Sequence, residues 1–166
     1  MKGREHLILG TVVGASVAAA TRNYDNGLIF MSACIVGSLF PDIDLPDSKL
    51  GHLIKPISAL LNKIFGHRGF IHTPVLTLIY WLITRAVDPA VFRIVTLGFL
   101  VGFTVHLIQD TFTKGGIMWL YPVKLKIHFT NIGSDSFLCF FITIALAIGW
   151  MVLLHNIPEI GAWLIS

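Results

Sequence analysis

The chain alternates between long apolar runs and short polar stretches. Four runs of 16 residues and a fifth of 23 residues contain no Asp, Glu, Lys or Arg. They are residues 6–21, 26–41, 69–84, 94–109 and 136–158. Runs of this kind are typical of membrane-inserted helices. We therefore predict an all-α, multi-pass bundle of about four or five membrane helices forming one domain over residues 1–166, with segments at about 6–21, 26–41, 72–87, 93–110 and 136–156.

Composition agrees with this interpretation, because 55% of residues are hydrophobic, 13% are charged and the mean hydropathy is +0.79. Such values exclude an ordinary soluble domain. A 16-residue helix is about 24 Å long against about 30 Å of hydrocarbon. The shorter segments therefore need flanking side chains that reach the interface, such as Arg22, Arg85 and Arg93. The basic start and the apolar run after it also resemble a signal peptide, and this alternative stays open.

Two segments between the apolar runs have patterns of their own. Residues 48–66 carry apolar side chains at helical spacing with lysines between them, which predicts a basic helix lying in the membrane surface, started or broken at Pro56. Residues 123–129 alternate apolar and polar, which predicts a short strand or hairpin at the interface. Trp119 and Tyr121 are expected at headgroup level. Cys34 and Cys139 lie inside apolar runs and are interpreted as packing residues.

Lys and Arg are distributed unequally between the two sides that five spanning runs would create. Nine fall at the N-terminus and in the 42–68 and 110–135 loops, and three fall on the other side. The positive-inside rule therefore predicts a plasma membrane protein with these loops in the cytoplasm and its C-terminus outside.

Histidine and aspartate gather at the predicted cytoplasmic ends of four different segments. They are His6, Asp42 and Asp44, His67 and His72, and His106 and Asp110. His106 and Asp110 are four residues apart and share a helix face with Gly98 and Gly102, a pattern that lets another helix approach closely. His6 repeats the arrangement with Gly10 and Gly14 on its own helix. We expect both histidines to face the bundle interior.

The remaining site residues are predicted from local patterns. The prolines of PDIDLP favour an extended path, along which Asp42 and Asp44 would point the same way. Thr73 followed by Pro74 resembles a helix start, so GHRGFIH is expected to be a glycine-hinged loop that folds His67, Arg68 and His72 towards one point.

Histidine and carboxylate together are ligands for Zn²⁺, Fe or Mn. The residues therefore predict a divalent metal site, with zinc favoured, in which Arg68 would hold a phosphate. Each group also has a simpler explanation, since a lone interfacial histidine is often structural and an Asp after a helix often only forms a turn. His52 is interpreted as a solvated side chain, and His128 could line the rim of the site or simply belong to the alternating strand. His155 and Glu159 are left out because Pro158 disturbs their helix and the predicted topology places them outside.

With these residues identified, the sequence resembles the YdjM-like family of bacterial inner-membrane proteins, described as metal-dependent hydrolases. The matching pieces are His6 with Gly10, residues 37–44, residues 66–74 and residues 106–122. The family is distantly similar to zinc-dependent phospholipase C and P1-type nucleases, although this chain has no match for their later ligands. The resemblance also implies the DNA-damage regulator LexA as a partner.

These observations predict a membrane-bound hydrolase of a lipid or nucleotide-like phosphoester, with membrane lipids around it and no direct binding to nucleic acid. The predicted metal ligands are His6, Asp42, Asp44, His67, His72, His106 and Asp110. Asp42, Asp44 and Arg68 are the candidate catalytic residues, with a carboxylate as general base. Two alternatives remain: a metal or ion transporter, and a scaffold whose metal joins helices and whose loops bind a partner.

Overall fold

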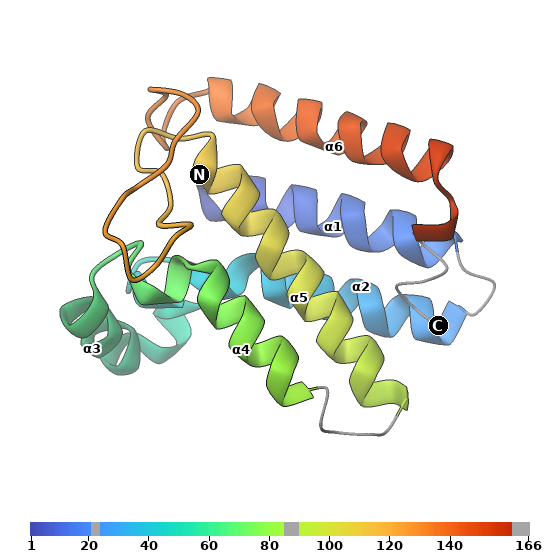
Figure 1. The fold of residues 1–166 in the computed structure, drawn as a ribbon, viewed down its shortest axis with the longest axis horizontal. Helices are drawn as coiled ribbons and strands as arrows, with labels where there is room; N and C mark the ends of the chain where they lie inside the picture. Colours follow the sequence, from blue (N-terminus) through green and yellow to red (C-terminus); the bar gives the residue numbers. More distant parts are fainter. Residues whose placement is uncertain (21–23, 85–89, 161–166) are drawn as a thin grey trace.

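The computed structural model describes residues 1–20, 24–84 and 90–160, which form a bundle of helices (Figure 1). The α-helices are α1 (Gly3–Ala20), α2 (Tyr24–Leu39), α3 (Lys55–Phe65), α4 (Pro74–Thr84), α5 (Ala90–Thr111) and α6 (Leu138–Asn156). Three short 3-10 helices lie between them: η1 (Phe40–Asp44), η2 (Gly51–Ile54) and η3 (Phe70–His72). The predicted all-helical membrane architecture is confirmed.

Three helical stretches of the described residues are long and apolar enough to cross a bilayer. They are Asp25–Asp44, Val91–Thr111 and Leu138–Asn156. α1 and α4 coincide with predicted segments, but they are not among these three, so their insertion stays a prediction. Arg22 and Arg85 lie outside the described residues.

The centre of the bundle is the contact between α2 and α5, with α1 on α2, α4 on α5 and α6 on α1. Glycines allow these close approaches. A Cβ on Gly102 would overlap the backbone of α2 at the Cys34 carbonyl, and one on Gly14 would lie 2.9 Å from the Cα of Met31. The predicted glycine faces of two helices are therefore confirmed. The adjoining core is formed by Leu9, Val13, Val17, Phe30, Cys34 and Ile94.

The segment between α5 and α6 differs from the predicted strand or hairpin. Within the described residues it forms one antiparallel bridge, between Ile117 and Ile127, and no strand. Pro122 lacks a backbone donor, and nearby N–H groups bond elsewhere: that of Phe129 donates to the Thr111 carbonyl at the end of α5. The alternating pattern therefore belongs to an irregular segment that covers one end of the bundle.

Other local predictions agree with the structure. α3 begins where Pro56 occupies its first turn, and α4 begins at Pro74. Cys34 and Cys139 are free and buried. His52, His128, His155 and Glu159 are exposed and lie outside the cluster described below.

Candidate metal centre

The seven predicted ligands meet at one end of the bundle, where α1 begins, α2 passes into η1, η3 leads into α4 and α5 ends (Figure 1). Six of them are buried, whereas the side chain of His67 is 38% exposed. Four separate chain segments therefore supply one polar cluster at the edge of an apolar bundle.

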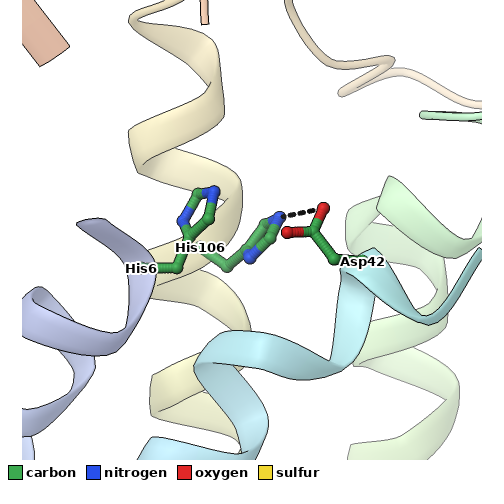
Figure 2. A group of neighbouring side chains, drawn as sticks. All are labelled: His6, Asp42 and His106. Carbon is green, nitrogen blue, oxygen red and sulfur yellow. Dashed lines mark ion pairs between the residues drawn. The ribbon is translucent and has the colours of Figure 1, made fainter. Parts of the chain in front are cut away.

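Five of these side chains form what we call the inner group: His6, Asp42, His72, His106 and Asp110. The rings of His6 and His106 stack with centroids 3.7 Å apart, and Asp42 faces His106 from the other side (Figure 2). Asp42 Oδ1 lies 3.5 Å from His72 Nε2 and 3.8 Å from His106 Nε2.

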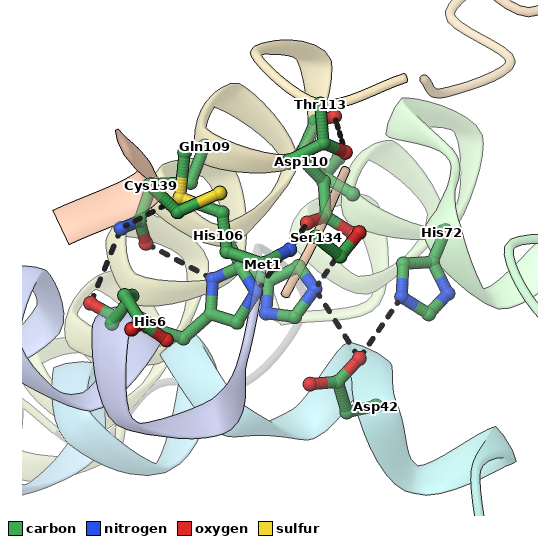
Figure 3. Close-up of polar contacts among 12 residues, drawn as sticks. Met1, His6, Asp42, His72, His106, Gln109, Asp110, Thr113, Ser134 and Cys139 are labelled. Carbon is green, nitrogen blue, oxygen red and sulfur yellow. Dashed lines mark hydrogen bonds and ion pairs between the residues drawn. The ribbon is translucent and has the colours of Figure 1, made fainter. Parts of the chain in front are cut away.

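Asp110 closes the inner group on the side of α5. Its Oδ1 lies 3.4 Å from His6 Nε2 and its Oδ2 lies 3.7 Å from His106 Nε2 (Figure 3). The i, i+4 spacing of His106 and Asp110 thus brings both side chains to one point, as predicted. His106 Nε2 therefore lies near both carboxylates, and His106 is shared by two triads of possible ligand atoms.

Asp42 and Asp44 do not follow the predicted extended path. Pro41 fits the first turn of a 3-10 helix, and η1 continues α2 through Asp44. Because residues two apart in such a helix point in different directions, the carboxylates separate. Asp42 faces His106, whereas Asp44 faces His67.

Asp44 and His67 lie behind the inner group, and we call them the outer pair. Asp44 Oδ1 lies 3.1 Å from His67 Nδ1, and Oδ2 accepts a hydrogen bond from the Arg68 N–H at 3.2 Å and lies 3.3 Å from His72 Nδ1. Both oxygens are thus engaged. Carboxylates in this position fix the orientation of a ligating imidazole. The structure therefore favours an orienting role for Asp44 on His72, which leaves His72 Nε2 directed at the inner group.

Hydrogen bonds also determine which nitrogen of His106 carries the proton. Its Nδ1 lies 2.8 Å from the carbonyl of Ser38, which can only accept, so Nδ1 must donate. The neutral ring then presents the lone pair of Nε2 to the inner group. This hydrogen bond depends on the close contact of α2 with α5 at Gly102.

Gln109 gives His6 the same arrangement, and sequence reasoning missed it. Its amide nitrogen donates to the carbonyl of Glu5 and to the hydroxyl of Thr143, both at 3.1 Å, so its oxygen faces His6. His6 Nδ1 donates to that oxygen at 3.0 Å, so the lone pair of the neutral ring lies on Nε2. The available signal was an amide side chain inside an apolar run, directly beside Asp110.

Replacing Gln109 with leucine removes the acceptor that orients His6, and we expect metal affinity to fall about 10- to 100-fold. Gln109→Glu is the matched variant, because it keeps an acceptor oxygen and should lose less affinity. Competition with a chromophoric chelator measures both constants. Equal affinities in the two variants and the parent protein would show that Gln109 does not orient a ligand.

Arg68 is held firmly at the edge of the inner group. Its Nη2 pairs with Asp110 Oδ2 at 2.9 Å, and Nη1 donates to the Thr113 hydroxyl at 2.9 Å. The residue adopts a positive φ of 60°, which is uncommon for a side chain other than glycine and is frequent at functional sites. A Cβ at Gly115 would overlap Nη1, which accounts for glycine there.

Two further groups surround Arg68 and Asp110. The Ser134 hydroxyl lies 3.3 Å from Arg68 Nη2, and the Met1 amino group pairs with Asp110 Oδ1 (Figure 3). Neither was identified from the sequence, because Ser134 and Met1 lie outside the histidine and aspartate motifs that defined the predicted site. Arg68 thus has its guanidinium largely engaged, while its Nε has no hydrogen-bond partner among the described residues.

The donor set fits a divalent metal. Three triads have ligand atoms that lie within 4.8 Å of one another: His6–Asp42–His106, Asp44–His67–His72 and His72–His106–Asp110. Buried atoms without hydrogen-bond partners in the described chain include the Nε2 atoms of His6, His72 and His106, each of which lies 3.4–3.8 Å from a carboxylate oxygen. Unpaired buried polar atoms are costly, and a cation held by the His6–Asp42–His106 triad or by the His72–His106–Asp110 triad would satisfy the nitrogens of that triad.

His72, which precedes α4 and lies outside the three candidate spans, is strongly affected by its neighbours. Burial lowers the pKa of its imidazole, but the close carboxylates of Asp42 and Asp44 outweigh burial and raise the pKa to about 9. Two carboxylates therefore attract positive charge at this position, whether a proton or a metal ion.

A polar cavity of about 340 Å³ opens beside the cluster. Asp42 and Arg68 line it from the site, and Lys2, Arg4 and Lys49 line it from outside. The exposed carboxylates of Asp47 and Asp135 also face it. The cavity therefore borders the inner group at Asp42, and its walls carry charges of both signs.

Together the fold and the site define a helical membrane protein with a buried histidine–aspartate cluster that could hold a metal. A model of the YdjM inner membrane protein family matches residues 1–166, and the chain belongs to that family. Its inner-membrane location is thereby supported.

Named relatives agree with this assignment. The uncharacterized protein YvsG of Bacillus subtilis is 33% identical over 128 residues, which are 77% of this chain and 78% of YvsG. Inner membrane protein YdjM of Escherichia coli is 30% identical over 135 residues, which are 78% of this chain and 69% of that protein, and YdjM of Shigella flexneri gives the same values. No solved structure matches the chain.

Proposed function

We propose that the protein is a metal-dependent hydrolase of phosphoesters, working at the cytoplasmic face of the inner membrane. The observation that carries this proposal is that three buried imidazole Nε2 atoms without hydrogen-bond partners lie beside the carboxylates of Asp42 and Asp110, in a cluster drawn from four chain segments. A cluster built only for structural stability would be expected to pair these atoms with one another.

The inner group is the proposed ligand set. His6, His72 and His106 would bind through Nε2, because hydrogen bonds or carboxylates engage Nδ1 of each ring. Asp42 and Asp110 would supply oxygen ligands. Nitrogen and oxygen donors of this kind favour zinc, with iron and manganese as alternatives. When bound, such an ion supplies Lewis acidity and makes water a stronger nucleophile at neutral pH.

The protein's own residues would bind and orient the ester. Arg68 lines the polar cavity and contacts Asp110, so its positive charge would hold a phosphate beside the inner group. Asp42 also lines the cavity, and the oxygen of its carboxylate that does not bind metal is the better candidate to accept a proton. Both oxygens of Asp44 are already engaged, so we assign it to orienting His72.

A structural metal that joins helices is the second candidate, and one observation favours it: the ligands come from α1, η1, η3 and α5. In that case the loops could serve a protein partner, and the LexA contact implied by the family resemblance stays a prediction. A transport role has less support, because the polar cluster lies at one end of the bundle and not along the spans.

Hydrolysis can be tested on the full chain reconstituted in liposomes. Metal is removed with a chelator and restored as Zn²⁺ or Mn²⁺, and release of product is followed from a soluble diester, a nucleotide and phospholipids. We expect metal-dependent turnover that Asp42→Asn lowers by at least about 100-fold, the scale of a lost general base. Asp47→Asn, an exposed neighbour in the same cavity, is the matched control.

Two other outcomes have distinct meanings. Tight metal binding without turnover of any ester would favour the structural metal. Absence of metal binding in the wild type would reject both candidates.

A further inference from the structure

The apolar face of α3 points away from the protein. Leu53, Ile57, Leu60 and Ile64 follow one face across η2 and α3, and they are 77%, 55%, 56% and 61% exposed. The opposite face carries Ser58, which is fully buried. Helices on the surface of a soluble protein place these faces the other way round.

The inward face of α3 is fixed to the site by polar contacts. Asn62 Nδ2 donates to the backbone carbonyl of Asp44 at 2.9 Å, and the loop with His67 and Arg68 follows the helix directly. The exposed apolar face is therefore held in place and is not the result of a loosely attached segment. α3 lies at the end of the bundle where the site is found (Figure 1).

The Asp, Glu, Lys and Arg side chains of η2, α3 and the residues that flank them, 48–66, are all basic. Residues 48–66 contain three lysines, Lys49, Lys55 and Lys63, and no Asp or Glu. All three are exposed. An exposed apolar stripe with basic side chains beside it suits a helix that lies in the interface of a membrane with anionic lipids.

The segment that follows α5 extends this surface. Its exposed apolar side chains are Leu120, Val123, Leu125 and Phe129, and Lys124 and Lys126 lie between them. Aromatic contacts join it to α3: the ring centroids of Phe65 and Phe70 are 5.7 Å apart, and those of Phe70 and Tyr121 are 5.4 Å apart. Aromatic side chains of this kind are enriched at membrane interfaces.

We propose that α3 and residues 120–129 form a single surface that lies in the anionic headgroup region of the inner membrane. Leu53, Ile57, Leu60 and Ile64 enter the outer part of the acyl layer, and the lysines contact lipid phosphates. This goes beyond the proposed hydrolysis and does not depend on it. Since Asn62 joins α3 to Asp44, the same contact sets the mouth of the polar cavity at headgroup depth.

The depth of α3 can be measured with nitroxide labels on the full protein in liposomes that contain phosphatidylglycerol. Cys34 and Cys139 are first replaced by alanine, and single cysteines are then placed at Leu60 and Ala59. Ala59 is an exposed neighbour on a different face of the helix. We expect the Leu60→Cys label to be reached by oxygen in preference to a water-soluble nickel chelate, and the Ala59→Cys label to show the opposite order.

Three results would overturn the proposal. If the nickel chelate reaches both labels in preference to oxygen, the apolar face does not contact lipid and is instead available to a protein partner. Strong dipolar coupling between Leu60→Cys labels would indicate a second copy of this chain. An unchanged depth in Lys55→Gln/Lys63→Gln, or in phosphatidylcholine alone, would remove the requirement for anionic lipid. None of these readouts depends on metal or turnover, so they are independent of the fate of the hydrolase proposal.

Discussion

Replacing Asp110 with alanine is expected to lower metal affinity by more than about 100-fold, beyond the effect usual for residues that only support a ligand. Asp110 contacts His6, His106 and Arg68 at once. Its loss also leaves the buried guanidinium of Arg68 without its ion-pair partner, which typically costs about 3–5 kcal/mol of stability. Elemental analysis of detergent-purified protein and thermal unfolding would measure the two effects.

Asp25→Ala is the matched control, because Asp25 is an exposed carboxylate at the start of α2, the end remote from the cluster. It should keep its metal and its unfolding temperature. If Asp110→Ala cannot be purified, Asp110→Asn retains an acceptor for Arg68 while removing the ligand charge. Metal retained at wild-type affinity in Asp110→Asn and in His72→Ala would refute the assignment of the inner group.

The composition of the site was predictable from sequence because its ligand types are rare in apolar runs. His6, Asp42, His72, His106 and Asp110 stand out against residues that a membrane accepts readily, and their shared end followed from the order of the segments. The distinction between inner group and outer pair was not predictable. It depends on how η1 turns at Pro41, which directs Asp42 and Asp44 apart, and sequence spacing alone suggested that they point together.

Supporting contacts were the least predictable part of the site. The carbonyl of Ser38 and the amide of Gln109 orient His106 and His6, and they do so across helices that are far apart in sequence. A backbone carbonyl leaves no sequence signal of its own. The helix pattern predicted which residues face inward, but the protonated nitrogen of each ring could be assigned only once the partner atoms were placed.

The strand prediction failed for a related reason. Alternating side chains at residues 123–129 satisfy a strand pattern, but a sheet also needs a partner with free backbone groups. Among the residues that the structure describes, only Ile117 forms such a pairing, and the N–H of Phe129 donates to the end of α5 instead. By contrast, the glycines at positions 98 and 102 predicted a close helix contact correctly. Small residues four apart on one helix face let a second helix approach closely, whatever side chains that helix carries.

That helix contact leads to the second large effect. Gly102→Ala places a methyl group against the Cys34 carbonyl and the Ser38 amide of α2, so α2 and α5 must separate. Overpacking of this kind typically costs about 1–3 kcal/mol. Separation would also lengthen the 2.8 Å hydrogen bond from His106 Nδ1 to Ser38, so we expect weaker metal binding together with a lower unfolding temperature.

Gly149→Ala provides the matched control for this substitution. Gly149 lies within α6, and a Cβ there would meet no atom within 4 Å among the described residues. The change should therefore leave metal affinity untouched and stabilise the helix by up to about 1 kcal/mol, the difference in helix propensity. If Gly102→Ala loses stability but keeps full metal affinity, His106 is oriented independently of the α2–α5 contact. If Gly102→Ala loses neither stability nor metal affinity, the interface between α2 and α5 can accommodate a methyl group at position 102.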